Sequence, residues 1–367
     1  MLSILVILVS VISSISASAS SSSEFNASEC GIAKMEKDGA YITTVSAEAL
    51  NAIRIANVSD KSQLCANQRS VSANNTEMNK EVLKVVGYDD EDFIVMGDEE
   101  VNYLANNAES MVITDTYYRM DENGNTELVS LEEYNNAQVS LAYSSDNDAE
   151  TSVEVEEGWF HITTTAVYLD PSTQNGEKGW YVFSGNFEWL SIPNYKMIDA
   201  ASLGFNVQLE WSNDLTQYFS TRVDKYKYHG LVELGIGEET TYTSLDTTNT
   251  SRKEYTDLHL YSDGLYCEWQ LPSDIVGSDY SVLYELTGCE IYLRGKARIG
   301  LYNSEQGFTV FSRYEHTYSA VSWQPSFSWD ESILGVVAES FALVNGSNTY
   351  SSHCGVVYDP TASSERG

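Results

Sequence analysis

The sequence predicts a mainly β protein in which a small helical N-terminal subdomain precedes an antiparallel β-sandwich or jelly-roll-like domain. Three observations lead to this prediction. Apolar residues recur with helical spacing before residue 137, they alternate with polar residues beyond residue 158, and turn sequences separate the alternating runs. With 367 residues and 42% apolar content, the chain can fill one large core and a smaller one.

The start of the chain predicts export. Residues 2–19 carry no charge, and their apolar part has the length of a signal-peptide h-region. Ala17-Ser-Ala19 fits a cleavage site, so residues 1–19 are interpreted as a signal peptide. No Lys or Arg precedes Lys34. The missing positive n-region leaves open an uncleaved segment that anchors the protein to a membrane, and we expect a secreted or cell-envelope protein.

Composition divides the remaining chain into four parts. A loose polar segment is expected at residues 20–40 and a small α+β subdomain at residues 41–137. Residues 138–157 are polar and acidic and predict a linker, after which residues 158–367 form the β-sandwich domain.

Capping residues mark the helices of the N-terminal part. Ser46 and Thr76 are candidate N-caps of two helices, and Gly87 suits the C′ position that closes the second. Asp89-Asp90 and Asp98 each begin a short segment with acidic residues in its first turn, which suits the positive end of the helix dipole.

A strand is predicted at residues 111–120, followed by a turn at residues 121–125 and a helix that begins with the capping box of Ser130 and Glu133. Asp121, Asn123, Asn125 and Glu132 also have the spacing of a calcium loop. Thr126 stands where that loop needs Gly, so a hairpin turn is the preferred interpretation and no metal site is predicted.

The second half predicts about nine strands without intervening helices. Apolar and polar residues alternate most cleanly along residues 203–211, 265–271 and 291–301. Less regular runs cover residues 159–169, 180–190, 218–228, 255–262, 308–323 and 332–344. Strands with one apolar and one polar face are typical of antiparallel sheets with one side in water.

A family resemblance covers about two thirds of the chain. The segments at residues 87–93, 112–118 and 121–124, followed by residues 159–211, resemble uncharacterised exported proteins of Gram-positive bacteria. The layout of a short helical part before an all-β part is similar too. This resemblance implies an extracellular address and a layout, and it implies no activity.

The charge balance excludes some partners. The chain has 54 acidic and 20 basic residues, a net charge of −34, which repels nucleic acid and anionic lipid. Cations, cationic surfaces and neutral partners such as sugars remain open. A cell-wall polymer or another glycan is the partner we expect.

The sequence contains none of the common catalytic motifs. The chain has no P-loop, no H-E-x-x-H, no G-x-S-x-G and no C-x-x-C, and its five histidines have no metal-ligand spacing, so no cofactor is expected. His353 and Cys354 are adjacent and weakly suggest a thiol nucleophile. Paired carboxylates of the glycosidase kind are the alternative, with Glu188, beside Trp189, as the first residue to test.

The candidate binding residues form one basic stripe. Arg294, Lys296 and Arg298 alternate along a predicted strand, so all three project from the same face. They predict contact with an anionic partner, and pairing with acidic neighbours on adjacent strands is the simpler alternative.

Two further sets of side chains share a strand face. Tyr218, Tyr226 and Tyr228 could stack on sugar rings or pack within the sheet. Cys267 and Cys289 both have core-facing parity, which allows a disulfide between them in an exported protein or two buried thiols. The resulting hypothesis is a non-catalytic binding or surface-interaction module, with a secreted hydrolase as the alternative.

Overall fold

The fold is known from a computed structural model of the chain. The structure describes residues 31–62, 71–120, 126–146, 158–192, 198–213, 217–228, 249–254, 258–271, 275–276, 282–299, 308–317, 325–330, 337–341 and 347–356. The predicted signal peptide at residues 1–19, the turn at residues 121–125 and most of the proposed linker lie outside these ranges.

The described residues form four α-helices, α1 (Ala47–Ser62), α2 (Val71–Val86), α3 (Asp90–Asn107) and α4 (Leu131–Asp146), and one 3-10 turn at Pro171–Thr173. The strands are β1 (Ile32–Lys37), β2 (Ala40–Val45), β3 (Ala108–Met120), β4 (Thr126–Val129), β5 (Gly158–Leu169), β6 (Trp180–Ser191), β7 (Ile198–Phe205), β8 (Leu209–Trp211), β9 (Tyr218–Tyr228), β10 (Asn249–Glu254), β11 (Leu258–Tyr261), β12 (Gly264–Gln270), β13 (Ile275–Val276), β14 (Val282–Ile299), β15 (Phe308–Thr317), β16 (Pro325–Asp330), β17 (Val337–Phe341) and β18 (Ser347–Val356).

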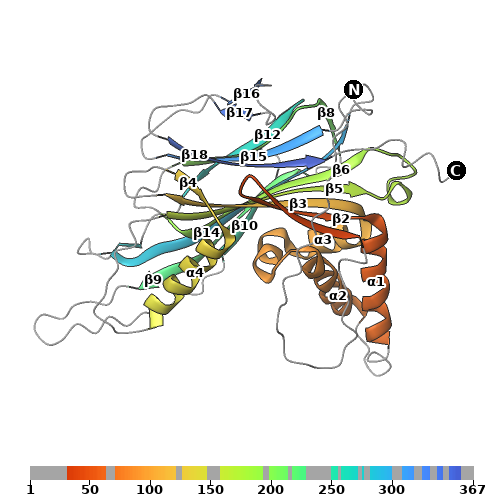
Figure 1. Cartoon of the computed structure of the whole chain (residues 1–367), viewed down its shortest axis with the longest axis horizontal. Coiled ribbons are helices and arrows are strands. Elements are labelled where there is room, and N and C mark those ends of the chain that lie inside the picture. Colours follow the sequence, from red (N-terminus) through yellow and green to blue (C-terminus); the bar gives the residue numbers. More distant parts are fainter. Residues whose placement is uncertain are drawn as a thin grey trace, which may run out of the picture.

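These elements make three layers, with the helices on one side of a large sheet and a small sheet on the other (Figure 1). Within the described residues, the large sheet has 11 strands with the main order β1-β2-β3-β5-β6-β14-β9-β10, and the small sheet has five in the order β11-β12-β7-β15-β18. All described pairings within them are antiparallel. The predicted mainly β fold with an antiparallel sandwich is therefore confirmed.

The largest apolar cluster fills the space between the two sheets. Large-sheet residues such as Phe160, Phe183 and Leu293 meet small-sheet residues such as Phe205 and Leu265, and each of the five is fully buried. Burial of apolar surface stabilises by roughly 25 cal/mol per Å², so this interface is a main source of the fold's stability.

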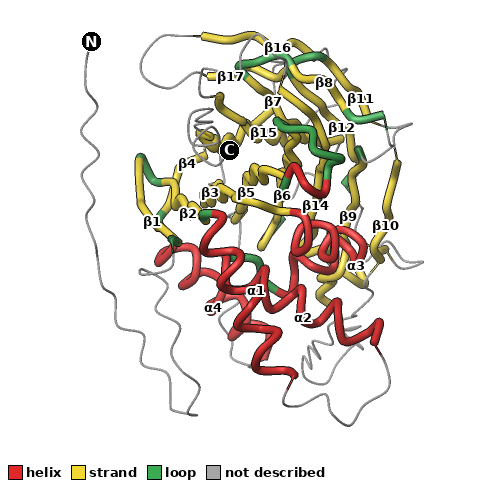
Figure 2. The backbone as a smooth tube through the Cα atoms, turned by 90° about the vertical axis from the view of Figure 1, so that its right-hand side faces the viewer, coloured by secondary structure: helices red, strands yellow, loops and turns green. Residues whose placement is uncertain are grey.

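The predicted N-terminal subdomain shares its sheet with the rest of the chain. β3 pairs along its whole length with β5, from Ala108 opposite Leu169 to Met120 opposite Gly158. Helices α1 to α3 cover the opposite face of this sheet from the small sheet, as the turned view also shows (Figure 2). The first 137 residues thus supply one border of the large sheet and most of its helical cover.

The segment expected to be loose at residues 20–40 contains a strand. β1 pairs with β2 through a two-residue turn in which Asp38 and Gly39 have φ of 53° and 79°. Positive φ at both central residues is the requirement of a type I′ hairpin turn, and Asp-Gly is a preferred sequence for it. The Asp-Gly signal was present in the sequence and was missed.

One of the two predicted N-caps is confirmed. Ser46 caps α1, since its Oγ accepts the Ala49 N–H at 3.2 Å, whereas Thr76 lies inside α2, which begins at Val71. Gly87 follows α2 with φ of 128°. The two predicted acidic segments are the two halves of α3, which bends where Gly97 leaves helical geometry at φ 74°.

The predicted strand at residues 203–211 is two strands in different sheets. β7 belongs to the small sheet and β8 to the large one, and residues 206–208 carry the chain between them. The alternation of Leu203, Phe205, Val207 and Leu209 persists through the crossing because all four point into the shared core.

The hairpin interpretation of residues 121–125 fits its flanks, because β3 pairs with β4 from Met120 opposite Thr126. The capping box of α4 is confirmed: Glu133 accepts the Ser130 N–H at 2.8 Å, and Ser130 Oγ accepts the Glu133 N–H at 3.2 Å. α4 extends to Asp146, into the proposed linker. Within the described residues, no helix is both long and apolar enough to cross a membrane.

The cap of α3 gives a first testable prediction. Asp89 accepts the N–H groups of Glu91 and Asp92, and Asp92 in turn accepts the N–H of Asp89. Asp89→Ala should lower the free energy of unfolding by about 1 kcal/mol in urea denaturation, because two backbone donors lose their acceptor. Asp89→Asn keeps an acceptor oxygen and is the matched control. Equal loss in both variants would mean that charge rather than capping matters here.

Candidate functional site

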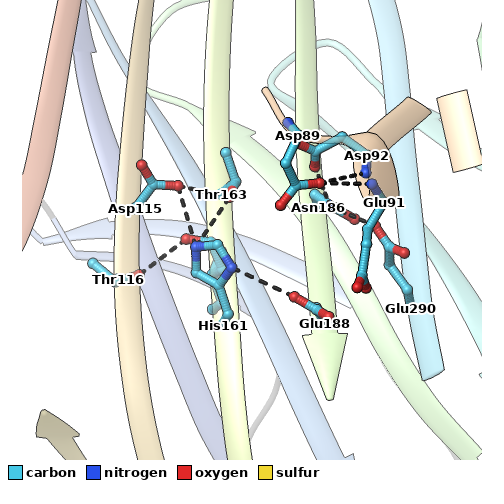
Figure 3. A network of polar contacts seen from close by, with 11 residues as sticks. Asp89, Glu91, Asp92, Asp115, Thr116, His161, Thr163, Asn186, Glu188 and Glu290 are labelled. Carbon is cyan, nitrogen blue, oxygen red and sulfur yellow. Dashed lines mark hydrogen bonds and ion pairs between the residues drawn. The ribbon is translucent and has the colours of Figure 1, made fainter. Parts of the chain in front are cut away.

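A network of polar side chains lies on the helix-facing side of the large sheet (Figure 3). Adjacent strands β3, β5 and β6 supply Asp115, His161 and Glu188. In the strand register, His161 lies opposite Glu188 on β6, and Asp115 lies opposite Thr163, two residues further along β5. Antiparallel pairing therefore brings together three charged side chains that are far apart in the sequence.

His161 lies between the two carboxylates. Its Nε2 is 3.2 Å from Asp115 Oδ1, and its Nδ1 is 3.7 Å from Glu188 Oε2. Thr163 Oγ1 donates a 2.7 Å hydrogen bond to the same Asp115 oxygen. The Tyr117 ring stacks on the imidazole with centroids 4.5 Å apart. The His161 side chain is 19% exposed, so the cluster is shielded from solvent but reaches the surface.

The electrostatics fix the charge of this histidine. Burial disfavours the imidazolium, but the contacts with the Asp115 and Glu188 carboxylates outweigh burial and raise the pKa of His161 to about 10. The ring is therefore a cation at neutral pH, with both nitrogens acting as donors. A protonated imidazole cannot accept a proton, so His161 does not serve as a general base.

Asn186 links a second carboxylate pair beside this cluster. Its Nδ2 donates to Asp92 Oδ1 at 2.9 Å and to Glu290 Oε1 at 2.6 Å. Burial and the nearby Asp89 carboxylate raise the pKa of Asp92 to about 7. Since Asp92 lies in the first turn of α3 and Glu290 on β14, the amide fastens the start of the helix to the sheet.

The geometry limits what these carboxylates can do. Glu188, the residue singled out from the sequence, lies opposite Glu290 in the register, but it is engaged with His161. Glu290 is 1% exposed. A glycosidase needs one carboxyl as acid and one as base or nucleophile, both in contact with substrate. This pair offers one partly exposed member and one buried member.

The basic stripe lies under α3. Arg294 is 2% exposed, and its Nε donates to Glu100 Oε1 on the helix at 2.9 Å. Lys296 is 8% exposed and lies over the rings of Tyr103 and Trp180. Only Arg298 reaches the surface, 3.9 Å from Glu177. The three side chains do share one face, as predicted, but α3 covers the two that precede Arg298.

The cysteine and tyrosine candidates do not form a binding surface among the described residues. Cys267 on β12 and Cys289 on β14 both project into the core between the sheets, where they are buried as thiols and no disulfide joins them. Tyr218 is buried, and its hydroxyl donates to the Met96 carbonyl of α3 at 3.3 Å. The side chains of Tyr226 and Tyr228 lie outside the described residues.

The loop residues Asp121, Asn123 and Asn125 and the side chains of His353 and Cys354 lie outside the described residues as well. Among the residues that the structure describes, no group of three or more His, Cys, Asp or Glu side chains could hold a metal ion.

A buried polar network lies between the sheets. The Tyr314 hydroxyl donates to Asp199, Trp189 Nε1 donates to the Tyr314 hydroxyl at 3.0 Å, and His316 Nδ1 lies 3.0 Å from Asp199 Oδ2. Asp199 and His316 are both fully buried. Such a network pairs buried polar groups with one another within an apolar core.

An aromatic group with a buried central ring, Tyr266, and two exposed outer rings lies on the hairpin of β11 and β12 and was not singled out from the sequence. Tyr266 stacks against His259 at 4.5 Å and against Tyr261 at 6.2 Å, with ring planes 11° and 18° apart. Tyr261 is 38% exposed, and His259 is exposed. Glu268 and Gln270 follow Tyr266 at alternate positions of β12 and are exposed too. The hairpin thus combines ring faces with hydrogen-bonding side chains.

The aromatic group of the hairpin and the His161 cluster could not be predicted from the sequence, because each depends on which strands pair and in which register. His161 and Asp115 become neighbours through the β3–β5 register, and His259 meets Tyr266 through the β11–β12 register. The only usable signal was local: the turn Ser262-Asp-Gly264 with aromatic residues on both sides predicts a hairpin whose rings meet across the strands.

Comparisons with known proteins add little. No family model and no curated protein matches the chain. A structure from work on pH-induced modulation of Streptococcus parasanguinis adhesion by Fap1 fimbriae is 9% identical, covers 54% of this chain and 81% of its own, and has a TM-score of 0.23. The Fe(II)/α-ketoglutarate-dependent dioxygenase TqaL is 10% identical, with coverages of 69% and 91% and a TM-score of 0.17. TM-scores this low carry no argument about fold or function.

The Arg294–Glu100 pair gives a second prediction. Arg294→Met should lower the free energy of unfolding by about 3–5 kcal/mol, because Glu100 is left as an unpaired buried charge. The double variant Arg294→Met with Glu100→Leu should recover much of this loss in urea denaturation. Arg298→Gln, which alters a partly exposed pair, should change stability by less than about 1 kcal/mol. A similar loss in Arg298→Gln would contradict this assignment.

The His161 pKa gives a third prediction. An NMR titration of the imidazole should find its midpoint near pH 10, and Glu188→Gln should lower that midpoint by removing one of two carboxylates. The unfolded ring loses its proton near pH 6.5. The stabilisation from His161 is therefore full below that pH, declines as pH rises, and is lost through pH 10.

Denaturation of wild type and His161→Gln at a series of pH values should show their difference shrinking over this range. A midpoint at or below about 7, close to that of an ordinary histidine, would contradict the assignment.

Proposed function

We propose that the chain is an exported, non-catalytic surface-interaction module that binds a neutral glycan through the β11–β12 hairpin. The observation that carries this proposal is the pair of exposed rings, His259 and Tyr261, held in place by stacking on the buried Tyr266 and lying beside the exposed Glu268 and Gln270. Aromatic faces pack on the apolar faces of sugar rings, and carboxylate and amide groups pair with sugar hydroxyls.

The electrostatics support a neutral ligand. A net charge of −34 repels anionic polymers, including nucleic acid and phosphate-rich cell-wall chains, but it does not oppose an uncharged polysaccharide. Burial together with Tyr261 and Glu268 raises the pKa of Tyr266 to about 12, so the ring that supports His259 and Tyr261 is uncharged. The export part of the proposal rests on the leader-like residues 1–19.

The hydrolase alternative has weaker support. The carboxylates brought together on the large sheet have positioning contacts: Glu188 neutralises His161, and Asp92 and Glu290 share the Asn186 amide. An acid–base pair needs both members at the substrate. Within the described residues, a ligand has better access to the rings of the β11–β12 hairpin than to this carboxylate cluster.

Binding to an array of neutral and anionic glycans tests the proposal. Tyr261→Ala should weaken binding to neutral glycans about tenfold, because a stacking contact contributes about 1–1.5 kcal/mol. Ile55→Ala removes another exposed apolar side chain, 67% exposed on α1, and should leave binding unchanged. No binding to any neutral glycan, or equal binding by Tyr261→Ala and Ile55→Ala, would contradict the proposal.

A further inference from the structure

Among the described strands, none pairs with the outer edge of β1. This strand stands at one end of the strand order of the large sheet, at a border of the strand layer in Figure 2. Its pairing within the described residues is with β2 alone. Five of its six residues are exposed, and only Ile32 is buried. Strand edges of this kind pair readily with another strand unless the sequence prevents it.

The β1–β2 register shows which backbone groups face outwards. Ser46 N–H donates to the Gly31 carbonyl, so Gly31 and Ser46 form a hydrogen-bonded pair just before Ile32 opposite Val45. Hydrogen-bonded pairs alternate along an antiparallel ladder. The odd residues of β1 therefore direct their backbone groups to β2, and Ile32, Lys34 and Glu36 direct theirs away from the sheet.

The side chains on this edge are self-complementary. In an antiparallel pair of two β1 strands centred on Met35, Lys34 lies opposite Glu36 of the second copy, and Glu36 lies opposite Lys34. Both pairs use residues whose backbone groups point outwards, so each pair exchanges two backbone hydrogen bonds. Opposite charges directly across such a ladder are favourable.

Neighbouring registers are disfavoured by the same pattern. A shift of the register by two residues keeps the outward backbone groups facing each other. It places Lys34 opposite Lys34 or Glu36 opposite Glu36, and like charges directly across a ladder repel. In the centred register, Met35, which is 55% exposed, meets Met35 of the second copy and buries its apolar side chain. One register therefore satisfies charges, backbone groups and apolar surface together.

We propose that β1 is a homodimerisation edge, through which two copies of this chain join their large sheets about a two-fold axis at Met35. The axis is perpendicular to the sheet, so the helical layers of both copies lie on the same side. A closed two-fold contact uses up the edge and does not propagate into a fibre. The net charge of −34 on each copy opposes association, and salt at physiological ionic strength screens this long-range repulsion more than the contacts themselves.

Analytical ultracentrifugation of the purified protein over a series reaching high micromolar concentrations, at about 0.15 M salt, tests this proposal. Wild type should show a reversible monomer–dimer equilibrium. Lys34→Glu and Glu36→Lys should each weaken dimerisation about tenfold or more, because each creates two like-charge pairs in the symmetric contact. The double variant Lys34→Glu with Glu36→Lys should restore the dimer.

Lys37→Glu is the matched control. It makes the same charge change as Lys34→Glu on the same exposed strand, but Lys37 lies opposite Ala33 of the second copy and should leave the dimer nearly unchanged. Glu36→Pro removes an outward N–H without touching the β1–β2 ladder and should abolish dimerisation while circular dichroism stays that of the wild type. A wild type that is monomeric throughout, a double variant that stays monomeric, or an equal effect of Lys37→Glu and Lys34→Glu would overturn the proposal.

Discussion

The arrangement of this protein depends on a sheet whose central strands are covered on both faces. Charged side chains on the helix-facing side have lost water and must be neutralised by their neighbours. The ion pair of Arg294 with Glu100 does this at the centre, where β14 meets α3. Because Arg294 is 2% exposed, a shift of α3 away from this position would leave a buried charge without its partner.

That position has further effects on the same face. It sets Asp92 within reach of Asn186 and brings the Met96 carbonyl to the Tyr218 hydroxyl. Beside α3, between Asp115 and Glu188, His161 is converted from a group that titrates near neutrality into a fixed cation. In a chain with 54 acidic residues, such internal cations allow carboxylates to be buried close together, because they offset the repulsion between them.

Local patterns predicted local structure well. The alternating runs gave β5, β6, β9 and β12 nearly at their observed bounds, and Ser46 and Ser130 cap helices as their sequences indicate. The sequence-based prediction failed for elements that local patterns do not mark. β10 and β18 were not predicted at all, and Thr76 was misjudged because α2 begins five residues earlier.

The same limit applies to the candidate site. Alternation correctly placed Arg294 and Lys296 on one face of a strand, and it was silent on the helix that covers them. Alternation also correctly predicted that Cys267 and Cys289 point into the core. It could not show that the two residues lie in different sheets, where they are buried as thiols. Periodicity tells which side chains share a face, but register and layer order decide whether that face meets water, a helix or a second sheet.

The order of strands has a consequence for how the chain reaches its native state. β6 pairs on one side with β5, which is close in sequence, and on the other with β14, so that Asn186 and Glu290 are bonded although 104 residues separate them. Contacts at such separation form slowly, because a long loop must close before they give any stabilisation. Until β14 pairs with it, β6 has an open strand edge on that side. Open edges of this kind pair with other chains, so the folding chain is most exposed to aggregation before the β6–β14 ladder forms.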